Sequence, residues 1–267
     1  MRAGPRRGRP VLALLLVLTP TLAVGAALDP VQLMHGVQRQ DAALAEKVDF
    51  TMQLVDASGR VRERTGTVIE RQVAPDAVDE MRLIRFRSPA DFRGSAVLTI
   101  EHPDRDHDQW IYLPAYHTTR RIASANRGDR YLGTDFLYED IMRARIEEYR
   151  YTVLGEETLA GARCVIIEAV PVAEKLQRET AYSRTLSWVD PARSIILRVD
   201  YYDREGAFFK RLTVAGIEMV SGSYRPTALR MEDVARRHVT IVRYHNRKIG
   251  VDVPESDFTE RHLKRGR

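Results

Sequence analysis

Apolar and polar residues alternate through most of this chain, and that period of two is the feature that most limits its fold. From Val48 the stretch DFTMQLVD places Phe50, Met52 and Leu54 on one side. The turn residues DASG then bring the chain back through RVRERTGTVIER. Successive side chains of a strand point to opposite faces of its sheet, so this alternation predicts strands with a buried face.

Strand-like runs continue almost to the end of the chain. They read MRLIRFRS, GSAVLTIE, DQWIYL, EEYRYTVLG, CVIIEAV, AYSRTLSWV, SIILRVDYYD, FFKRLTVAGIEMV, TALRMED and HVTIVRYH, and the connections between them include HPDRD, LAG, VDPARS, DREG and SGSYRP. Strand–helix–strand alternation is not visible, which excludes a doubly wound parallel sheet. We predict a mainly β (α+β) fold: one domain over residues 27–267 with a single antiparallel sheet of about eleven strands. Open sheets of this size tend to curl, and we expect short helices over the concave face.

Two segments predict helices. ALDPVQLMHGVQRQDAALAEK has Asp29 as a candidate N-cap and Pro30 at the first helical position. In GTDFLYEDI, Thr134 or Asp135 can accept hydrogen bonds from a starting helix. Its apolar side and its first-turn acids are Phe136, Leu137, Ile141, Glu139 and Asp140.

The three acids of GTDFLYEDI have more than one interpretation. Capping and the favourable helix dipole explain Asp135, Glu139 and Asp140 without any reaction. The alternatives are a carboxylate pair for acid–base chemistry and a surface that binds a partner. We favour capping, and with it a helix that covers the sheet.

The first residues have the three-part layout of a secretory signal. MRAGPRRGRP carries four arginines, VLALLLVL is a short apolar run, and the segment closes at Val24, Gly25 and Ala26. We predict a signal peptide over residues 1–26, read by the general secretory route and not by twin-arginine export. The apolar run is far shorter than the roughly 20 residues of a membrane-spanning helix. No cysteine stands directly after the predicted cleavage site, so we expect a periplasmic protein without a lipid anchor.

Charge and cysteine content exclude several classes. The whole chain has a net charge of +5, and removing the four arginines of the signal leaves +1 for residues 27–267. A nearly neutral chain gives no support for a nucleic-acid partner. The single thiol, Cys164 in the apolar run CVII, allows no internal disulfide. We expect a small buried hydrophobe there, with an intermolecular bridge as the alternative.

Motifs of catalysis and of metal binding are absent or incomplete. The chain has no G-x-S-x-G, H-E-x-x-H, Gly-rich phosphate loop or C-x-x-C. In HPDRDHD the aspartate spacing is that of a calcium loop, but Gln109 and Ala115 stand where Gly and Glu belong. A polar hairpin tip explains it, with a partial divalent-ion site as the alternative. We predict no catalytic residues, no metal and no cofactor.

A large sheet with few helices cannot cover all of its apolar face, which predicts a pocket for an apolar ligand. The plainer interpretation of each aromatic strand residue is an ordinary β core. Candidate wall residues of the cavity are Phe50, Met52, Ile84, Phe86, Leu98, Trp110, Leu186, Trp188 and Leu197. Which strand face is concave is left open by the alternation.

Four blocks in order resemble one known family. SPADFRGSAVLTIE, QWIYLPAYHTTRRIA, YLGTDFLYEDI, and SWVD with YYDREGAFFKRL are similar to the outer-membrane lipoprotein-sorting protein family, also called LolA-like. The likeness spans about residues 80–260. It implies a curved antiparallel half-barrel with an apolar concave face closed by short helices, which binds lipid or acyl chains in the bacterial envelope. It implies no catalytic residues.

The favoured hypothesis is therefore a periplasmic carrier or chaperone of lipid or acylated lipoprotein. We expect a monomer that contacts membranes transiently and meets an inner-membrane transporter. The alternatives are an envelope sensor or adaptor working with a lipid-exporting pump, and a lipid-modifying enzyme. The two helices would be lid and plug. Arg120 and Arg121 would pair with Asp135, Glu139 or Asp140, unless they are solvated strand residues.

Overall fold

The computed structural model describes residues 4, 28–42, 45–74, 77 and 79–265, and the predicted signal peptide lies almost wholly outside them. The α-helices are α1 (Pro30–Asp41), α2 (Glu174–Glu179) and α3 (Glu260–Arg265). The strands are β1 (Ala45–Val55), β2 (Val61–Gln72), β3 (Glu80–Ser88), β4 (Ala96–Ile100), β5 (Asp108–Leu113), β6 (Thr118–Arg121), β7 (Tyr149–Leu159), β8 (Ala162–Pro171), β9 (Arg184–Asp190), β10 (Ile195–Tyr202), β11 (Phe208–Val214), β12 (Ile217–Val220), β13 (Ser223–Pro226), β14 (Ala228–Asp233) and β15 (His238–Ile249).

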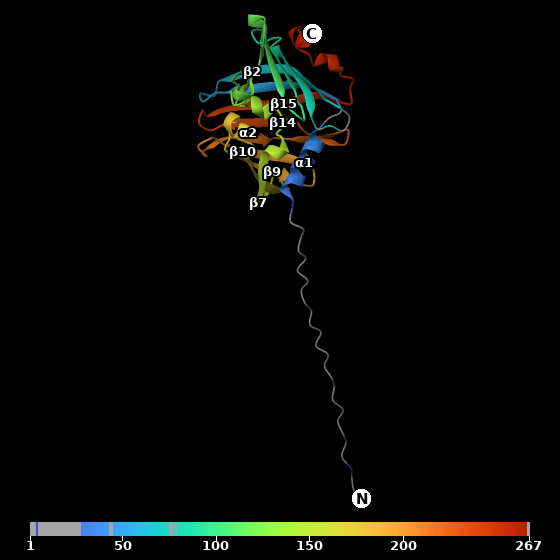
Figure 1. The fold of residues 1–267 in the computed structure, drawn as a ribbon, viewed down its shortest axis with the longest axis vertical. Helices are drawn as coiled ribbons and strands as arrows, with labels where there is room; N and C mark the ends of the chain where they lie inside the picture. The colour runs from blue at the N-terminus through green and yellow to red at the C-terminus, as the bar shows by residue number, and fades with distance from the viewer. Residues whose placement is uncertain (1–3, 5–27, 43–44, 75–76, 78, 266–267) are drawn as a thin grey trace.

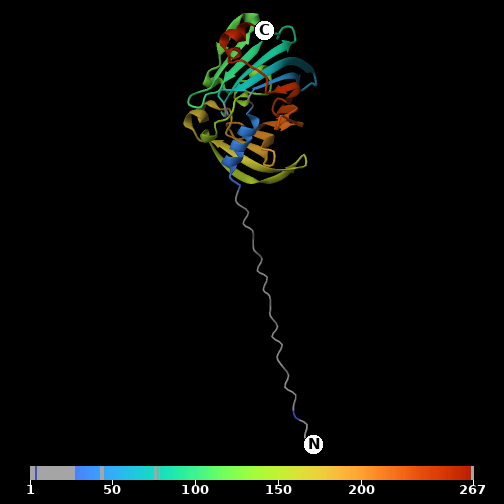
Figure 2. The ribbon, with the colours of Figure 1, turned by 90° about the vertical axis from the view of Figure 1, so that its right-hand side faces the viewer.

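Thirteen strands form one antiparallel sheet in the order β6-β5-β4-β3-β2-β1-β15-β14-β11-β10-β9-β8-β7. Most neighbours are consecutive hairpins, and β1 pairs with β15, so the two ends of the sequence meet in the middle of the sheet. The sheet is not closed, because β6 and β7 are its two edges. Strands β12 and β13 pair only with each other. The mainly β prediction is confirmed at this level, and Figures 1 and 2 show a bent sheet with α1 packed beside its β7–β10 half.

The predicted count of about eleven strands was too low. Strand β6, TTRR, has no apolar alternation to signal it. The run FFKRLTVAGIEMV is broken at Ala215 and Gly216 into β11 and β12. A Cβ on Gly216 would stand 2.3 Å from the Thr227 hydroxyl oxygen, so the chain can pass Thr227 only with glycine there. SGSYRP was read as a turn, but SYRP forms β13.

Helix α1 begins as predicted and ends early. The Asp29 carboxylate accepts from the Val31 N–H at 2.9 Å, and Pro30 occupies the first turn. The sequence prediction continued the helix through Lys47, but Ala45 already opens β1. α1 packs Leu33, Met34 and Val37 against an apolar cluster of β8 and β9 formed by Val165, Ile167 and Val189.

The central segment, residues 122–148, crosses the face of the sheet that α1 covers. Since β6 and β7 are opposite edges, the chain between them has to run from one side of the sheet to the other. The segment contains only short 3-10 turns: η2 (Ser124–Asn126), η3 (Tyr131–Gly133), η4 (Tyr138–Ile141) and η5 (Ile146–Glu148). We call the face beneath it the inner face. The long connection is thus what places side chains over the middle of the sheet.

The predicted helix in GTDFLYEDI is wrong as an α-helix. The Thr134 hydroxyl accepts from Phe136 N–H and donates to the Tyr131 carbonyl, which makes a local turn. The Asp140 carboxylate accepts from Leu137 N–H at 2.6 Å, so Asp140 caps only the 3-10 turn η4. Of the three acids only Asp140 therefore caps a turn, and no apolar helical face forms.

On the opposite, outer face, the C-terminal residues cover the part of the sheet around β3, β4 and β5. Val253, Phe258 and Leu263 pack against Leu83 and Leu98. Arg85 fixes this cover because its guanidinium donates to the carbonyls of α3 residues. The expectation that the helices cover the concave face holds for α1 and fails for α3. None of the helices among the described residues is long and apolar enough to cross a membrane.

Candidate functional site: two cavities on the inner face

The first cavity, here called the central cavity, lies between the middle of the sheet and the central segment. Its volume is about 230 Å³. Apolar side chains of β1, β2, β3, β14 and β15 form most of its wall, and Tyr131, Phe136 and Ile141 close it from the central segment. The apolar strand residues are Val48, Phe50, Met52, Val68, Ile84, Leu229 and Val242.

The second cavity, here called the α1 cavity, lies between α1, the central segment and strands β7–β11. Its volume is about 390 Å³, within the range of roughly 300–1,000 Å³ that small-molecule sites occupy. Met34 and Val37 of α1 line it, together with apolar strand residues such as Leu212 and Val214. Five tyrosines also line it: Tyr149, Tyr151, Tyr182, Tyr201 and Tyr224. Its wall is mostly apolar, with hydroxyls at several points.

The two cavities are neighbours. Asp41 at the end of α1, Asp140 of the central segment and Pro226 of β13 line both of them. The partition between the cavities therefore comes from the elements that cover the sheet. Moving α1 or the central segment would alter both cavities together.

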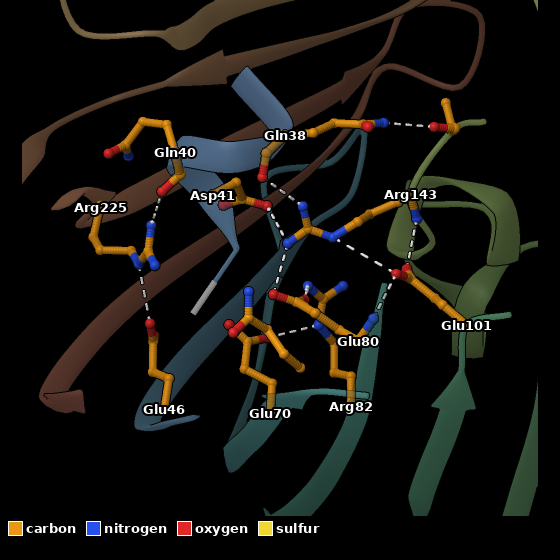
Figure 3. Close-up of polar contacts among 12 residues, drawn as sticks. Gln38, Gln40, Asp41, Glu46, Glu70, Glu80, Arg82, Glu101, Arg143 and Arg225 are labelled. Carbon is orange, nitrogen blue, oxygen red and sulfur yellow. Dashed lines mark hydrogen bonds and ion pairs between the residues drawn. The ribbon is translucent and has the colours of Figure 1, made fainter. Parts of the chain in front are cut away.

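An ionic cluster joins α1 and the central segment to the sheet. Its members are Glu46, Glu70, Glu80, Arg82, Glu101, Arg143, Arg225 and Arg247, most of them visible in Figure 3. Arg143 of the central segment is the link to the sheet: its guanidinium lies 2.6 Å from Glu80 and 3.6 Å from Glu101. The same guanidinium donates to the Gln38 carbonyl of α1 and pairs with Asp41 at 3.1 Å. One arginine thus joins sheet, central segment and helix.

A second arginine makes a similar link at β13. Arg225 Nε donates to the Glu46 carboxylate of β1 at 3.1 Å, and its Nη1 donates to the Gln40 carbonyl of α1 at 2.9 Å. Arg247 of β15 pairs with the other oxygen of Glu46. Burying such charges is unfavourable unless each has a partner, and these carboxylates have theirs.

Carboxylates outnumber guanidinium groups around Arg82 and Arg143, and the pKa values of several of these carboxyls are raised. Burial, and after it the neighbouring Glu70, raise the pKa of Glu80 to about 8. Burial likewise raises the pKa of Glu101 and of Glu46, the latter with a further contribution from Glu70. Glu46 and Glu70 face each other across β1 and β2. Protonating one carboxyl of the cluster relieves this repulsion.

The acids of GTDFLYEDI are also tied to the sheet. The Lys210 ammonium of β11, which is fully buried, pairs with Asp140, and Tyr182 donates to the same carboxylate at 2.6 Å. Glu139 accepts from the Thr180 hydroxyl and the Ala181 N–H. These bonds fix the central segment between β9, β11 and the residues after α2.

Asp135 has the partners of a structural carboxylate. Its carboxylate lies 2.7 Å from His238 Nδ1 and accepts from the Thr240 hydroxyl. An Asp–His pair can serve catalysis when the other imidazole nitrogen meets a nucleophile. His238 Nε2 is buried and has no hydrogen-bond partner among the described residues. The pair therefore anchors the central segment to β15.

The nine predicted wall residues divide between the two faces. Phe50, Met52 and Ile84 line the central cavity, and Phe86 belongs to the same inner core. The others lie on the outer face: Leu98 and Trp110 in the cluster under α3, and Leu186, Trp188 and Leu197 in a cluster around Cys164. Cys164 is buried with a free thiol, as expected. Ligand contact by any of the nine stays a prediction.

The expected arginine pairs are corrected by the structure. Arg121 pairs with Asp108 on β5 and not with an acid of the central segment. Arg120 forms no ion pair with Asp135, Glu139 or Asp140 among the described residues. Strand β6 carries both arginines at the edge of the sheet, whereas those acids lie over its middle. The cations that do face Asp135 are Arg130 and Arg236.

In the HPDRDHD turn, Asp106 and Asp108 form ion pairs with cationic side chains of the protein itself. Asp108 pairs with Arg105 at 2.8 Å as well as with Arg121. Asp106 accepts from Ser124 and pairs with Lys175. Within the described parts of the chain, no three His, Cys, Asp or Glu side chains are grouped so that they could hold a metal ion.

The ionic cluster and the tyrosine lining of the α1 cavity were missed by sequence reasoning. A signal existed for part of the cluster. Glu46 has the same strand parity as Val48 and Phe50, and Arg82 that of Ile84, so each is a charge at an apolar position of its strand. Their partners lie far away in sequence, and only the fold brings them together.

Comparisons with protein families and with solved structures found proteins similar to this chain. A family model described as "Uncharacterized protein" matches residues 78–265. A search of curated proteins found no match. A structure titled as an outer membrane lipoprotein-sorting protein domain, from Vibrio parahaemolyticus, is 27% identical with a TM-score of 0.81, over 88% of this chain and 98% of its own. A DUF1329 family protein from Desulfovibrio piger is 29% identical with a TM-score of 0.81, over 88% and 100%.

A LolA superfamily protein from Nitrosomonas europaea shares the fold at 19% identity, with a TM-score of 0.69 over 88% of this chain and 100% of its own. The open antiparallel sheet with a covered inner face thus defines a protein of the LolA-like class. The chain belongs to the outer-membrane lipoprotein-sorting family, in an uncharacterised branch. The resemblance drawn from its sequence blocks is confirmed.

Proposed function

We propose that this protein is a periplasmic carrier that binds lipid, or the acyl chains of lipoproteins, in the cavities of its inner face and moves them within the bacterial envelope. The observation that carries the proposal is the α1 cavity of about 390 Å³, mostly apolar and roofed by α1 and the central segment. The name of the Vibrio parahaemolyticus domain supports the same role.

The energetics suit an alkyl ligand. Each buried methylene contributes roughly 0.8 kcal/mol, so a chain of about sixteen carbons gains on the order of 10 kcal/mol before ordering costs. Such binding needs no catalytic group. Release requires the roof to move, and the roof is joined to the sheet by few elements: α1, the central segment and the ion pairs between them.

Several finer points belong to the proposal. Residues 1–26 would direct export, and residues 27–267 would act as one binding domain and as a monomer. Contact with membranes would be transient, and an inner-membrane transporter would deliver or receive the ligand. The residues Phe50, Met52, Ile84 and Phe86 would contribute to binding from the central cavity and its core.

The experiment is a fluorescence titration with pyrenedodecanoic acid. In Val214→Phe a larger side chain fills part of the α1 cavity, and we expect affinity to fall at least tenfold, which corresponds to about 1.4 kcal/mol. The matched control is Val234→Phe, since Val234 is exposed and is not among the residues that line the cavity. Equal affinities for both variants, or no binding by the unaltered protein, would contradict the proposal.

A further inference from the structure

Two buried hydrogen-bond donors in the wall of the central cavity have no partner. The Tyr131 hydroxyl is buried and unpartnered among the described residues, on a side chain that is 2% exposed. Arg225 is 3% exposed, and its Nη2 also lacks a partner within that part of the chain. Both residues line the same cavity. Buried polar atoms are normally satisfied, so two unsatisfied donors around one cavity point to acceptors that enter it.

The hydrogen bonds of Arg225 hold its guanidinium group in one orientation. Nε is used by Glu46, and Nη1 by the carbonyls of Gln40 and Tyr224. These bonds hold the guanidinium plane, and Nη2 remains as the unused donor. Tyr131 is held in place by its edge-to-face contact with Tyr138, with ring centroids 5.7 Å apart. Both donors are therefore fixed by bonds or packing that a ligand would not have to disturb.

The charges around the cavity select the kind of acceptor. Its lining holds four acids and three arginines: Asp41, Glu46, Glu70, Asp140, Arg82, Arg225 and Arg247. Each acid is paired inside the protein, Asp41 with Arg143 and Asp140 with Lys210 from outside the lining. Because Glu80 and Glu101 also pair with Arg82 and Arg143, no surplus positive charge is left for an anion. A carboxylate or phosphate would meet Glu46 and Glu70, and like charges in a buried site repel strongly.

We propose that the central cavity binds an amphiphile through uncharged ester oxygens, which accept hydrogen bonds from Tyr131 and Arg225 while its alkyl chain lies on the apolar wall. This rests on the proposed function and deepens it, because it names the ligand class as an esterified acyl chain and excludes a free fatty acid or a bare hydrocarbon. The apolar wall from Val48 to Val242 supplies the surface for the chain.

The test compares three probes of similar chain length, namely methyl laurate, laurate and dodecane, by displacement of a neutral ester reporter, methyl pyrenedodecanoate, from the purified protein. We expect methyl laurate to bind about tenfold more tightly than dodecane, as one or two hydrogen bonds provide, and more tightly than laurate. Equal binding of ester and hydrocarbon, or tighter binding of laurate, overturns the inference. If none of the three probes binds, the proposed function itself fails.

The variant Tyr131→Phe removes only the unpartnered hydroxyl. We expect it to abolish the advantage of the ester over dodecane without lowering the melting temperature. The matched comparison is Tyr182→Phe, which removes a hydroxyl that does have a partner, Asp140, and so should lower the melting temperature. Arg225→Lys keeps a charge beside Glu46 but lacks Nη2, and should also reduce ester binding. A lower melting temperature for Tyr131→Phe, or unchanged ester binding, overturns the inference.

Discussion

Strands β3 and β4 show how differently the two faces of the sheet are completed. On the outer face, Leu98 is fully buried and packs with Leu83 beneath Leu263 of α3. On the inner face, Ile84 of β3 borders the central cavity. Around Leu98 the outer face is filled by the protein's own apolar side chains. The inner face is roofed by segments that pack apolar residues such as Phe136 and Leu137 on the sheet and are also held by buried ion pairs, with cavities left between roof and sheet.

This difference has a physical basis. Apolar contacts are non-directional and fill space, as the C-terminal residues do over Leu83 and Leu98 on the outer face. Ion pairs and hydrogen bonds fix a segment at a few points. Arg143 and Lys210 hold the central segment in this way, and beside its packed residues Phe136 and Leu137 two cavities remain. A roof attached by discrete polar bonds can enclose a cavity that a ligand occupies.

The largest effect is expected from removing the main polar link, Arg143→Leu. Glu80 and Glu101 would each lose a buried cationic partner, and breaking a buried pair costs about 3–5 kcal/mol. Chemical denaturation measures the loss. The control is Arg163→Leu, whose pair with Glu156 is exposed and should contribute at most about 1 kcal/mol. Similar losses for the two variants would mean that the inner face is not held by its ion pairs.

The second-largest effect is expected from truncating one apolar side chain on each face of the sheet. Leu98→Ala should lower the free energy of unfolding by about 2–5 kcal/mol, because it opens a void in a filled core. Ile84→Ala should lower it by less, since that side chain already borders a cavity. Only Ile84→Ala should change the binding of methyl pyrenedodecanoate. An equal loss of stability, or a binding change in Leu98→Ala, would remove the distinction between the faces.

A pH dependence should follow from Glu80. Because its pKa is raised to about 8 in the folded protein, the folded state holds a proton that the unfolded state has released above about pH 4.3. The stabilisation is therefore present below that pH and is lost as the pH rises toward 8. Denaturation midpoints measured from pH 4.5 to 8.5 should show this decline, and Glu80→Gln should flatten it. A stability that rises with pH over this window contradicts the raised pKa.

The smallest effect is expected from Arg121→Ala. Arg121 is 59% exposed and pairs with Asp108 at the sheet edge, so its loss should cost less than about 1 kcal/mol. Release of pyrenedodecanoic acid should be unchanged, since Arg121 does not touch the central segment. Faster release would restore the idea, drawn from sequence, that this arginine holds the roof.

Much of the sheet could be predicted from the sequence, because alternation is a local property. The start of α1 was also predictable, since Asp29 and Pro30 act within one turn. The choice of inner face was not. In β4, Val97 and Leu98 are both buried although they point to opposite faces, so the apolar pattern of this strand does not indicate which face is the inner one. Five of the nine wall candidates accordingly fell on the outer face.

The roof of the inner face was harder to predict than the sheet. Residues 135–141 look like a helix start because acids favour helix N-termini. Tertiary partners decided otherwise: Asp135 is used by His238 and Thr240, and Asp140 by Lys210. Those partners lie about 70 to 105 residues away in sequence. A local pattern cannot contain such information.

The most direct test of the central claim is native mass spectrometry of the protein released from cells without detergent. If the inner face carries an acyl chain, the unaltered protein should show a mass increment that yields an alkyl-bearing compound on extraction, and Val214→Phe should have lost most of it. A bare protein mass in gently prepared samples, or the same increment in Val214→Phe, would contradict the claim that the cavities of the inner face are the ligand site.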